Sequence, residues 1–120
     1  LPVNTALNLG DVSSPISPTD TALYWHIPKA SGSSVKSYYS CMRLVQASDA
    51  SEVGGHEQDT SIQIWENAGG YKHVNVDTSR QDGIQKAIDF GLAESGLVDI
   101  AFTMFSGAAV SMFSPQHKGR

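Results

Sequence analysis

The stretch that most constrains the fold spans residues 22–35, where an apolar run is followed by a proline, a lysine and several small residues. Residues 22–27 have the length and the aromatic and β-branched content of a buried strand. Pro28 lacks an N–H and favours extended geometry in the residue before it, so the strand is expected to end there. Apolar residues then recur at helical spacing, at Val35, Tyr38, Met42 and Val45. The sequence therefore predicts a strand, a turn and a helix in succession.

The predicted turn has the features of an anion-binding loop. Residues 30–34 carry little side-chain bulk, which lets backbone N–H groups point at a ligand, and Ser33 and Ser34 are suited to cap the helix. A helix N-terminus carries roughly half a positive charge and several unpaired N–H donors. Because Lys29 adds a full charge, we expect the loop to bind a phosphate or sulfate group.

The order of residues in this loop excludes a Walker A motif. That motif has the form G-x-x-x-x-G-K-S/T, with the lysine after the glycines. Here Lys29 precedes Gly32, and no G-K-S/T occurs in the chain. An ordinary ATPase or GTPase is therefore disfavoured.

Residues 26–34 read H-I-P-K-A-S-G-S-S and closely resemble the H-I-P-K-T/A-G/S-G-T/S-T/S segment of carbohydrate sulfotransferases. In that family the segment binds the 5′-phosphosulfate of the donor PAPS (3′-phosphoadenosine 5′-phosphosulfate). Residues 74–78 and 117–120 are also similar to segments of sulfotransferase-domain proteins of algal type. Ala30 and Ser31 stand where many members have Thr and Gly.

The resemblance implies a PAPS-dependent sulfotransferase that transfers a sulfuryl group to a hydroxyl acceptor, which we expect to be a carbohydrate. It implies no metal ion, and location in the Golgi lumen with a membrane anchor outside these residues. It also implies that Lys29 stabilises the charge on the leaving phosphate oxygen. The donor-binding residues would be Lys29, Ala30, Ser31, Gly32, Ser33 and Ser34.

Sulfuryl transfer also requires a base that removes the acceptor's proton, usually His or Glu in this family. We assign this role to His56, which lies beside Glu57 in a glycine-rich stretch, with His73 and His117 as other candidates. His26 is expected to be structural. Family members hold the 3′-phosphate with an R-x-P-x-x-R-x-x-S-like segment, which does not occur in these 120 residues. The chain thus resembles the N-terminal portion of such a domain.

Two other functions stay open. The chain could be a non-catalytic binding module that keeps a nucleotide-type fold, or a kinase-like phosphoryl transferase with an unusual loop. Its net charge of −4 and its lack of a Lys/Arg cluster predict no nucleic-acid partner. No apolar run approaches the roughly 18–20 residues that span a bilayer, so no membrane contact is predicted within this chain. The expected partners are the small-molecule donor and the hydroxyl acceptor.

The rest of the chain predicts an α/β domain. Residues 1–20 are expected to be a flexible lead-in with little regular structure, and residues 21–120 a partial sulfotransferase-like domain. The first helix should end near Ala47, with Cys41 buried on it and Trp25 in the core. Further strands are predicted over 71–76 and 98–104, and helices over about 80–90 and 105–113, with either a short strand or a surface excursion between 48 and 70.

Strands separated by helices predict a parallel sheet with flanking helices. The resemblance narrows this expectation to the P-loop-containing nucleotide-hydrolase-like fold of sulfotransferases, in incomplete form.

Overall fold

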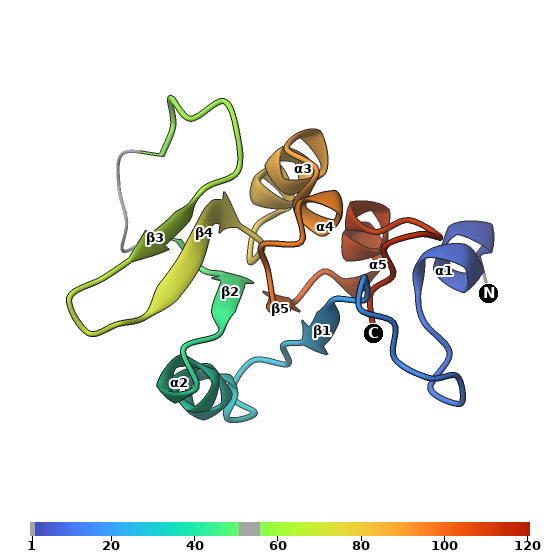
Figure 1. Cartoon of the computed structure of the whole chain (residues 1–120), viewed down its shortest axis with the longest axis horizontal. Helices are drawn as coiled ribbons and strands as arrows, with labels where there is room; N and C mark the ends of the chain where they lie inside the picture. The colour runs from blue at the N-terminus through green and yellow to red at the C-terminus, as the bar shows by residue number, and fades with distance from the viewer. Residues whose placement is uncertain (1, 51–55) are drawn as a thin grey trace.

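A five-stranded sheet forms the centre of the computed structural model, which describes residues 2–50 and 56–120 (Figure 1). Its strand order is β1-β5-β2-β4-β3. The parallel strands are β1 (Ala22–Trp25), β5 (Ile100–Thr103), β2 (Val45–Ser48) and β4 (Lys72–Asp77). At the edge, β3 (Ile64–Glu66) pairs antiparallel with β4. The predicted α/β class is confirmed, and the sheet is mixed because of β3.

Helices lie on both faces of this sheet (Figure 1). On one face lies α2 (Gly32–Cys41). On the other lie α3 (Gln81–Asp89), α4 (Leu92–Ser95), α5 (Ser106–Ala109) and the 3₁₀ turn η1 (Val110–Met112). None of the helices in the described ranges is long and apolar enough to cross a membrane.

The two faces of the sheet differ in chemistry. The apolar core lies between the sheet and helices α3 to α5, where Ala47, Val74 and Val76 pack against Ile84 and Ala87. The face toward α2 is aromatic and polar: Phe102 contacts the rings of Tyr24 and Tyr39, and buried polar side chains lie beside it on β2 and β4. Alternation along each strand produces this division, because successive side chains point to opposite faces.

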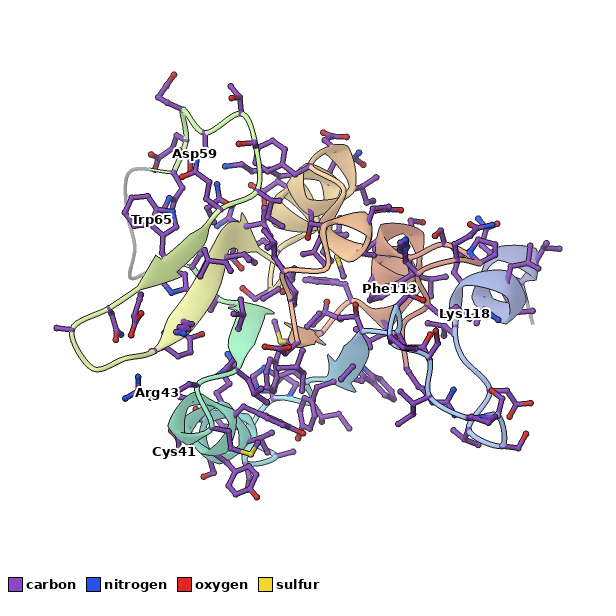
Figure 2. The ribbon with its side chains drawn as sticks, viewed as in Figure 1. Cys41, Arg43, Asp59, Trp65, Phe113 and Lys118 are labelled. Carbon is purple, nitrogen blue, oxygen red and sulfur yellow. The ribbon has the colours of Figure 1, made fainter. Side chains whose placement is uncertain are left out.

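The first helix ends earlier than predicted. Arg43 adopts a left-handed conformation with φ 58°. The N–H of Leu44 donates to the carbonyl of Tyr39 and the N–H of Arg43 to that of Ser40, which is the Schellman arrangement that closes helices. The chain then enters β2 at Val45. The apolar spacing that predicted a helix up to Ala47 therefore includes residues of α2 and the start of β2. Cys41 is exposed rather than buried (Figure 2).

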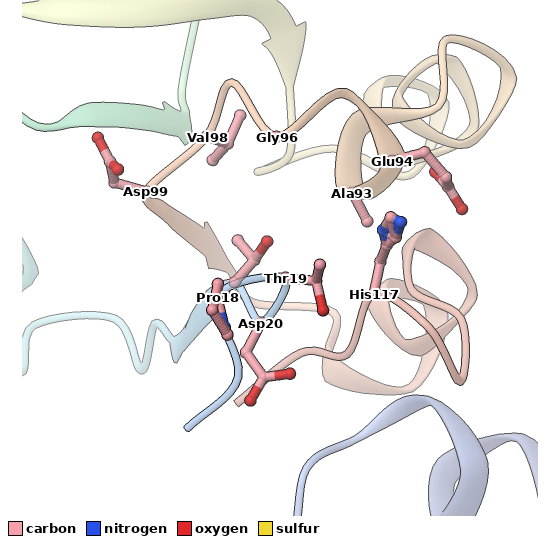
Figure 3. Close-up of a pocket in the computed structure, with 10 residues that line it drawn as sticks. Pro18, Thr19, Asp20, Ala93, Glu94, Gly96, Val98, Asp99 and His117 are labelled. Atoms are coloured by element: carbon pink, nitrogen blue, oxygen red, sulfur yellow. The ribbon is translucent and has the colours of Figure 1, made fainter. Parts of the chain in front are cut away.

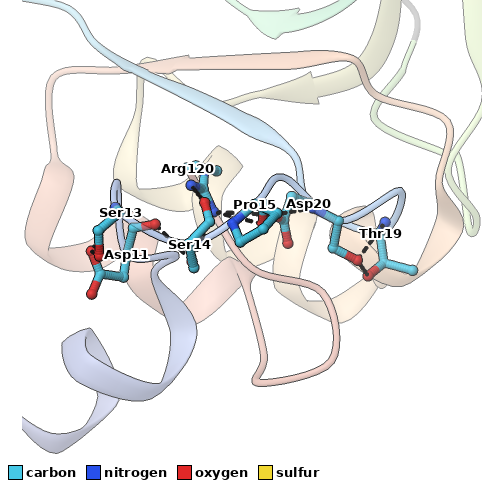
Figure 4. Close-up of polar contacts among 8 residues, drawn as sticks. Asp11, Ser13, Ser14, Pro15, Thr19, Asp20 and Arg120 are labelled. Atoms are coloured by element: carbon cyan, nitrogen blue, oxygen red, sulfur yellow. Dashed lines mark hydrogen bonds and ion pairs between the residues drawn. The ribbon is translucent and has the colours of Figure 1, made fainter.

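The N-terminal segment is more regular than predicted. It forms the helix α1 (Val3–Asn8), and the Asn8 side-chain amide donates to the carbonyl of Val110 in η1. The loop that follows is held by Arg120, whose guanidinium donates to Ser14 and to the carbonyl of Pro15 and lies 3.6 Å from an Asp20 carboxylate oxygen (Figure 4). The prediction of little regular structure before residue 21 was therefore wrong for α1.

Candidate functional site

The loop between β1 and α2 lies at the edge of the sheet where the parallel strands end. From β1 the chain passes through α2 to β2, on one side of β1. From β5, the neighbour of β1, it passes through α5 and η1 to Gly119, which pairs with Thr21 on the other side of β1. Neighbouring strands whose connections leave in opposite directions form a topological switch point, the usual ligand position in open α/β sheets.

The loop backbone presents a series of free donors. Lys29 and Ser31 both have φ 63°, a left-handed conformation that is uncommon outside glycine. Within residues 2–50 and 56–120, no acceptor pairs with the N–H groups of Lys29, Ser31, Gly32, Ser33 or Ser34, whereas the N–H of Ala30 donates to the Ile27 carbonyl. The last three belong to the first turn of α2, where helix geometry leaves N–H groups unpaired. This concentration of donors suits an anion.

Solvent surrounds most side chains of the loop. Lys29, Ala30, Ser31, Ser33 and Ser34 are all exposed, and Lys29 makes no ion pair with any carboxylate that the structure describes. Ser31 occupies the N-cap position, and no side chain caps the helix. The predicted capping by Ser33 or Ser34 was therefore wrong, and both hydroxyls remain available to a ligand.

His26 supports the loop from beneath. The backbone N–H of His26 donates to the carbonyl of Thr103 at 2.7 Å, which extends the hydrogen bonding between β1 and β5 by one residue pair. Its imidazole lies against Gly32, where a Cβ would stand 2.2 Å from Nε2. The predicted structural role of His26 thus has a physical basis: the ring fixes the start of α2 against the end of β1.

His56 belongs to a different part of the molecule. It is buried, and its Nδ1 lies 3.1 Å from an Asp59 carboxylate oxygen that also accepts a hydrogen bond from the Asn75 side-chain amide at 2.7 Å. The Asn75 hydrogen bond lowers the pKa of Asp59, and His56 lowers it further. An ionised Asp59 favours the tautomer with the proton on Nδ1, which leaves Nε2 of His56 as an acceptor. That Nε2 is buried and has no partner among the described residues.

His73 lies next to His56, with ring centroids 6.4 Å apart, and stacks on Tyr71 at 5.3 Å. It is only 3% exposed, and neither ring nitrogen has a partner in the described part of the chain. Burial lowers the pKa of His73, and the positive charge of a protonated His56 would lower it further. The Gln46 Oε1 and Ser48 Oγ atoms on β2 are buried and unpaired as well. Sequence reasoning missed this polar layer, although polar residues alternate with apolar ones at positions 46–48 and 73–76.

The structure does not bring Lys29 and His56 together. His56 packs on Trp65 of β3 and near His73 of β4, in the region where Figure 2 labels Trp65 and Asp59. Two strands, β5 and β2, separate β1 from β4. At about 4.8 Å per strand, β4 lies about 14 Å from β1. The assignment of His56 as the catalytic base stays a prediction without support from this geometry.

Two of the cavities that lie away from the loop are bordered by histidines considered as the base. One, of about 320 Å³, is bordered by His56, Asp77, Arg80 and Lys86. The Arg80 guanidinium there pairs with Asp82 at 3.0 Å, and Ser79 donates to Asp77 through its N–H and its hydroxyl. Lys86 donates to the carbonyl of His56, so Asp77, Arg80 and Lys86 already have partners.

The other cavity, of about 250 Å³, lies at the opposite edge of the sheet, where the strands begin (Figure 3). Three acidic residues, Asp20, Glu94 and Asp99, line it together with His117, so it is unsuited to a phosphosulfate. Over the described ranges, no group of three or more His, Cys, Asp or Glu side chains is placed to hold a metal ion.

No protein-family model matches the chain, and neither a curated protein nor a solved structure matches it.

Proposed function

We propose that the chain carries the 5′-phosphosulfate-binding loop of a PAPS-dependent sulfotransferase domain with a P-loop-like fold. The donor's phosphosulfate would lie over residues 29–34, and the acceptor would be a hydroxyl, plausibly that of a carbohydrate. The observation that carries the proposal is the row of unpaired N–H groups around Lys29 and Ser31, at the switch point of the sheet.

The backbone conformation supports this proposal. A non-glycine residue in the left-handed region costs roughly 1–2 kcal/mol, and such residues concentrate at binding sites. Lys29 and Ser31 are both in this region, two residues apart. Left-handed residues also occur in the backbone nests that hold phosphate groups, where successive amides face one ligand.

The chemistry expected of the loop is charge stabilisation. As the sulfuryl group leaves, negative charge builds on the bridging phosphate oxygen, and Lys29 with the amides of Gly32 and Ser33 would neutralise it. Loss of one comparable preorganised donor lowers kcat on the order of 100- to 1000-fold. In the in-line displacement, the acceptor oxygen bonds to sulfur, the sulfur–phosphate oxygen bond breaks, and a base takes the hydroxyl proton.

A non-catalytic anion-binding module is the alternative, and the separation of His56 from Lys29 favours it. In that case the loop would bind the donor, and no base would lie near enough to remove the proton of an acceptor hydroxyl. Turnover of PAPS in the presence of carbohydrate acceptors distinguishes the two functions, because only the enzyme releases adenosine 3′,5′-bisphosphate.

Donor binding itself is tested by isothermal titration calorimetry with adenosine 3′,5′-bisphosphate, PAPS, and ATP with magnesium. We expect PAPS and the bisphosphate to bind and ATP to bind more weakly; a reversed order would favour the kinase-like alternative. Lys29→Ala should abolish PAPS binding with little change in melting temperature, because Lys29 is exposed.

Lys72→Ala serves as the control, since Lys72 begins β4 at the opposite edge of the sheet. It should leave PAPS binding unchanged. Unchanged PAPS binding in Lys29→Ala, or an equal loss in both variants, would rule out the proposed loop.

A further inference from the structure

The sheet face opposite the apolar core holds a cluster of buried polar atoms on Gln46, His56 and His73. Gln46 of β2 is aligned with His73 of β4, and Trp65 of β3 is aligned with His73 from the other side. The His56 ring packs over this row, with its centroid 4.7 Å from that of Trp65 and 6.4 Å from that of His73. Gln46 Oε1, His56 Nε2 and both His73 ring nitrogens are buried and have no partner among the described residues.

Most of these atoms are hydrogen-bond acceptors. The Gln46 side chain donates through Nε2 to the Lys36 carbonyl at 2.9 Å, which leaves Oε1 as an unpaired acceptor. A neutral imidazole has one donor and one acceptor nitrogen, and the Nδ1 of His56 faces Asp59, so its Nε2 is an acceptor. His73 adds one acceptor and one donor. Because buried polar groups normally have partners, three acceptors beside a single N–H favour a cation at this cluster.

Asp59 holds His56 in the way that an outer-shell carboxylate holds a metal-binding histidine. One Asp59 oxygen lies 3.1 Å from His56 Nδ1 and accepts a hydrogen bond from the Asn75 amide at 2.7 Å. Lys86 fixes the backbone beside the ring by donating to the His56 carbonyl at 2.6 Å. A histidine ligand almost always donates its other ring N–H to such a group, which sets its tautomer and raises its basicity. Asp59 therefore prepares His56 Nε2 to bind a metal ion.

His73 also meets the requirements of a ligand. A histidine nitrogen binds a metal only when it is unprotonated, and burial lowers the pKa of His73, so its ring is neutral at pH 7. A zinc–nitrogen bond is about 2.0–2.1 Å long, so two nitrogens that share an ion lie at most about 4 Å apart. The 6.4 Å between the centroids of His56 and His73 allows this when one nitrogen of each ring faces the other.

We propose that His56 and His73 bind one divalent ion of the zinc class, with the Gln46 amide oxygen and solvent as further ligands. Imidazole nitrogen suits such an ion, whereas Mg²⁺ prefers oxygen ligands. The described ranges contain no metal group of three or more His, Cys, Asp or Glu side chains, so this site would keep positions open to solvent. Two strands separate β4 from β1, and the site does not depend on the donor proposal.

Isothermal titration calorimetry of the metal-free protein with zinc chloride tests the proposal, with magnesium chloride for comparison. We expect one zinc ion per chain and no binding of magnesium. Asp59→Asn should weaken zinc binding by roughly 10- to 100-fold, because it removes the charge behind His56. His73→Gln should weaken it at least as much. The controls are His117→Gln, at the opposite edge of the sheet, and Cys41→Ser, which removes an exposed thiol; both should bind zinc as the unsubstituted protein does.

Absence of zinc binding, or equal affinity in His73→Gln, would overturn the proposal. So would loss of zinc binding in either control, because the ion would then be held at the acidic cavity beside His117 or by the thiol of Cys41. If His73→Gln does not fold, nitrogen-15 NMR of the unsubstituted protein decides. Zinc should shift the ring nitrogen signals of both His56 and His73, and unchanged signals would reject the site.

Discussion

The imidazole of His26 takes up the space that a side chain at Gly32 would need, with Nε2 only 2.2 Å from the position of the missing Cβ. His26 follows β1, where its backbone N–H donates to the Thr103 carbonyl, and Gly32 is the first residue of α2. The contact therefore sets the angle at which helix and strand meet. The unpaired amides of Lys29 and Ser31 lie between these two residues in the chain, and those of Ser33 and Ser34 follow directly, so their positions depend on this contact.

Gly32→Ala is expected to destabilise the fold by about 1–3 kcal/mol, because the added methyl group overlaps the His26 ring. Urea unfolding measures the change. Gly107→Ala is the control, since Gly107 also lies in a helix and a Cβ there meets nothing within 4 Å. His26→Ala combined with Gly32→Ala should recover part of the loss. Equal effects of the two glycine substitutions would show that the His26 contact is unimportant.

Lys29→Gly should separate stability from binding. Glycine removes a left-handed strain of roughly 1–2 kcal/mol, while its greater freedom in the unfolded chain costs roughly 0.5–1 kcal/mol, so stability should rise by up to about 1.5 kcal/mol. PAPS binding should be lost with the charge. Arg43→Gly is a close match: Arg43 has φ 58°, and its loss changes the net charge equally. Arg43→Gly should give a similar gain in melting temperature and leave PAPS binding intact. Loss of PAPS binding in both variants would instead show that the net charge of the chain controls binding.

Stability should fall as the pH drops below about 6.5, the ordinary pKa of His. Burial lowers the pKa of His73 in the folded state, so the unfolded chain binds this proton first and acid favours unfolding. His56 and Tyr71 lie beside His73, and Asp59 is bonded to His56. The pKa of Asp59 is also lowered, so the stability that Asp59 contributes is lost only in more acidic solution, below about pH 4.

The measurement is the urea midpoint between pH 7.5 and 5.5. His73→Gln should reduce its pH dependence, although the substitution itself lowers stability. If the urea midpoint of His73→Gln depends on pH as strongly as that of the unsubstituted protein, other titratable groups cause the acid sensitivity.

Thr78→Val should cost about 1–3 kcal/mol, because it leaves a buried carbonyl unpaired. The Thr78 hydroxyl donates to the Phe102 carbonyl of β5 at 2.7 Å, and its N–H donates to the Ser48 carbonyl of β2 at 3.0 Å. Thr78 thus ties the ends of three strands together. Thr60→Val, at an exposed site, is the control and should change the urea midpoint little. A small effect at both positions would contradict this role.

Local sequence signals predicted the elements around the loop well. Pro28 and the small residues after it mark the end of β1 and the start of α2, because proline geometry and helix initiation depend on adjacent residues. The predicted strands over 71–76 and 98–104 correspond to β4 and β5 for the same reason. Val45 was misassigned to a helix because its apolar spacing suits either element, and Arg43 closes the helix in a conformation more typical of glycine.

Long-range placement could not be predicted in the same way. Trp25 was expected in the core, since it alternates within an apolar strand, yet it is largely exposed because β1 lies near the edge of the sheet and α5 is short. His56 looked like a partner for Lys29, yet two strands separate their surroundings. Strand order fixes both outcomes, and it depends on contacts between residues far apart in the chain.

By itself, the sequence determined where the loop proposed to bind an anion lies and which residues form it, because backbone geometry there follows from Pro28, Gly32 and their neighbours. Only the tertiary structure decided which distant residues meet: His26 with Gly32, His56 with Asp59 and His73 beside β4, and residues 118–120 with β1. The physical reason is that hydrogen bonds between strands and packing between layers join distant segments, and no local pattern specifies their partners.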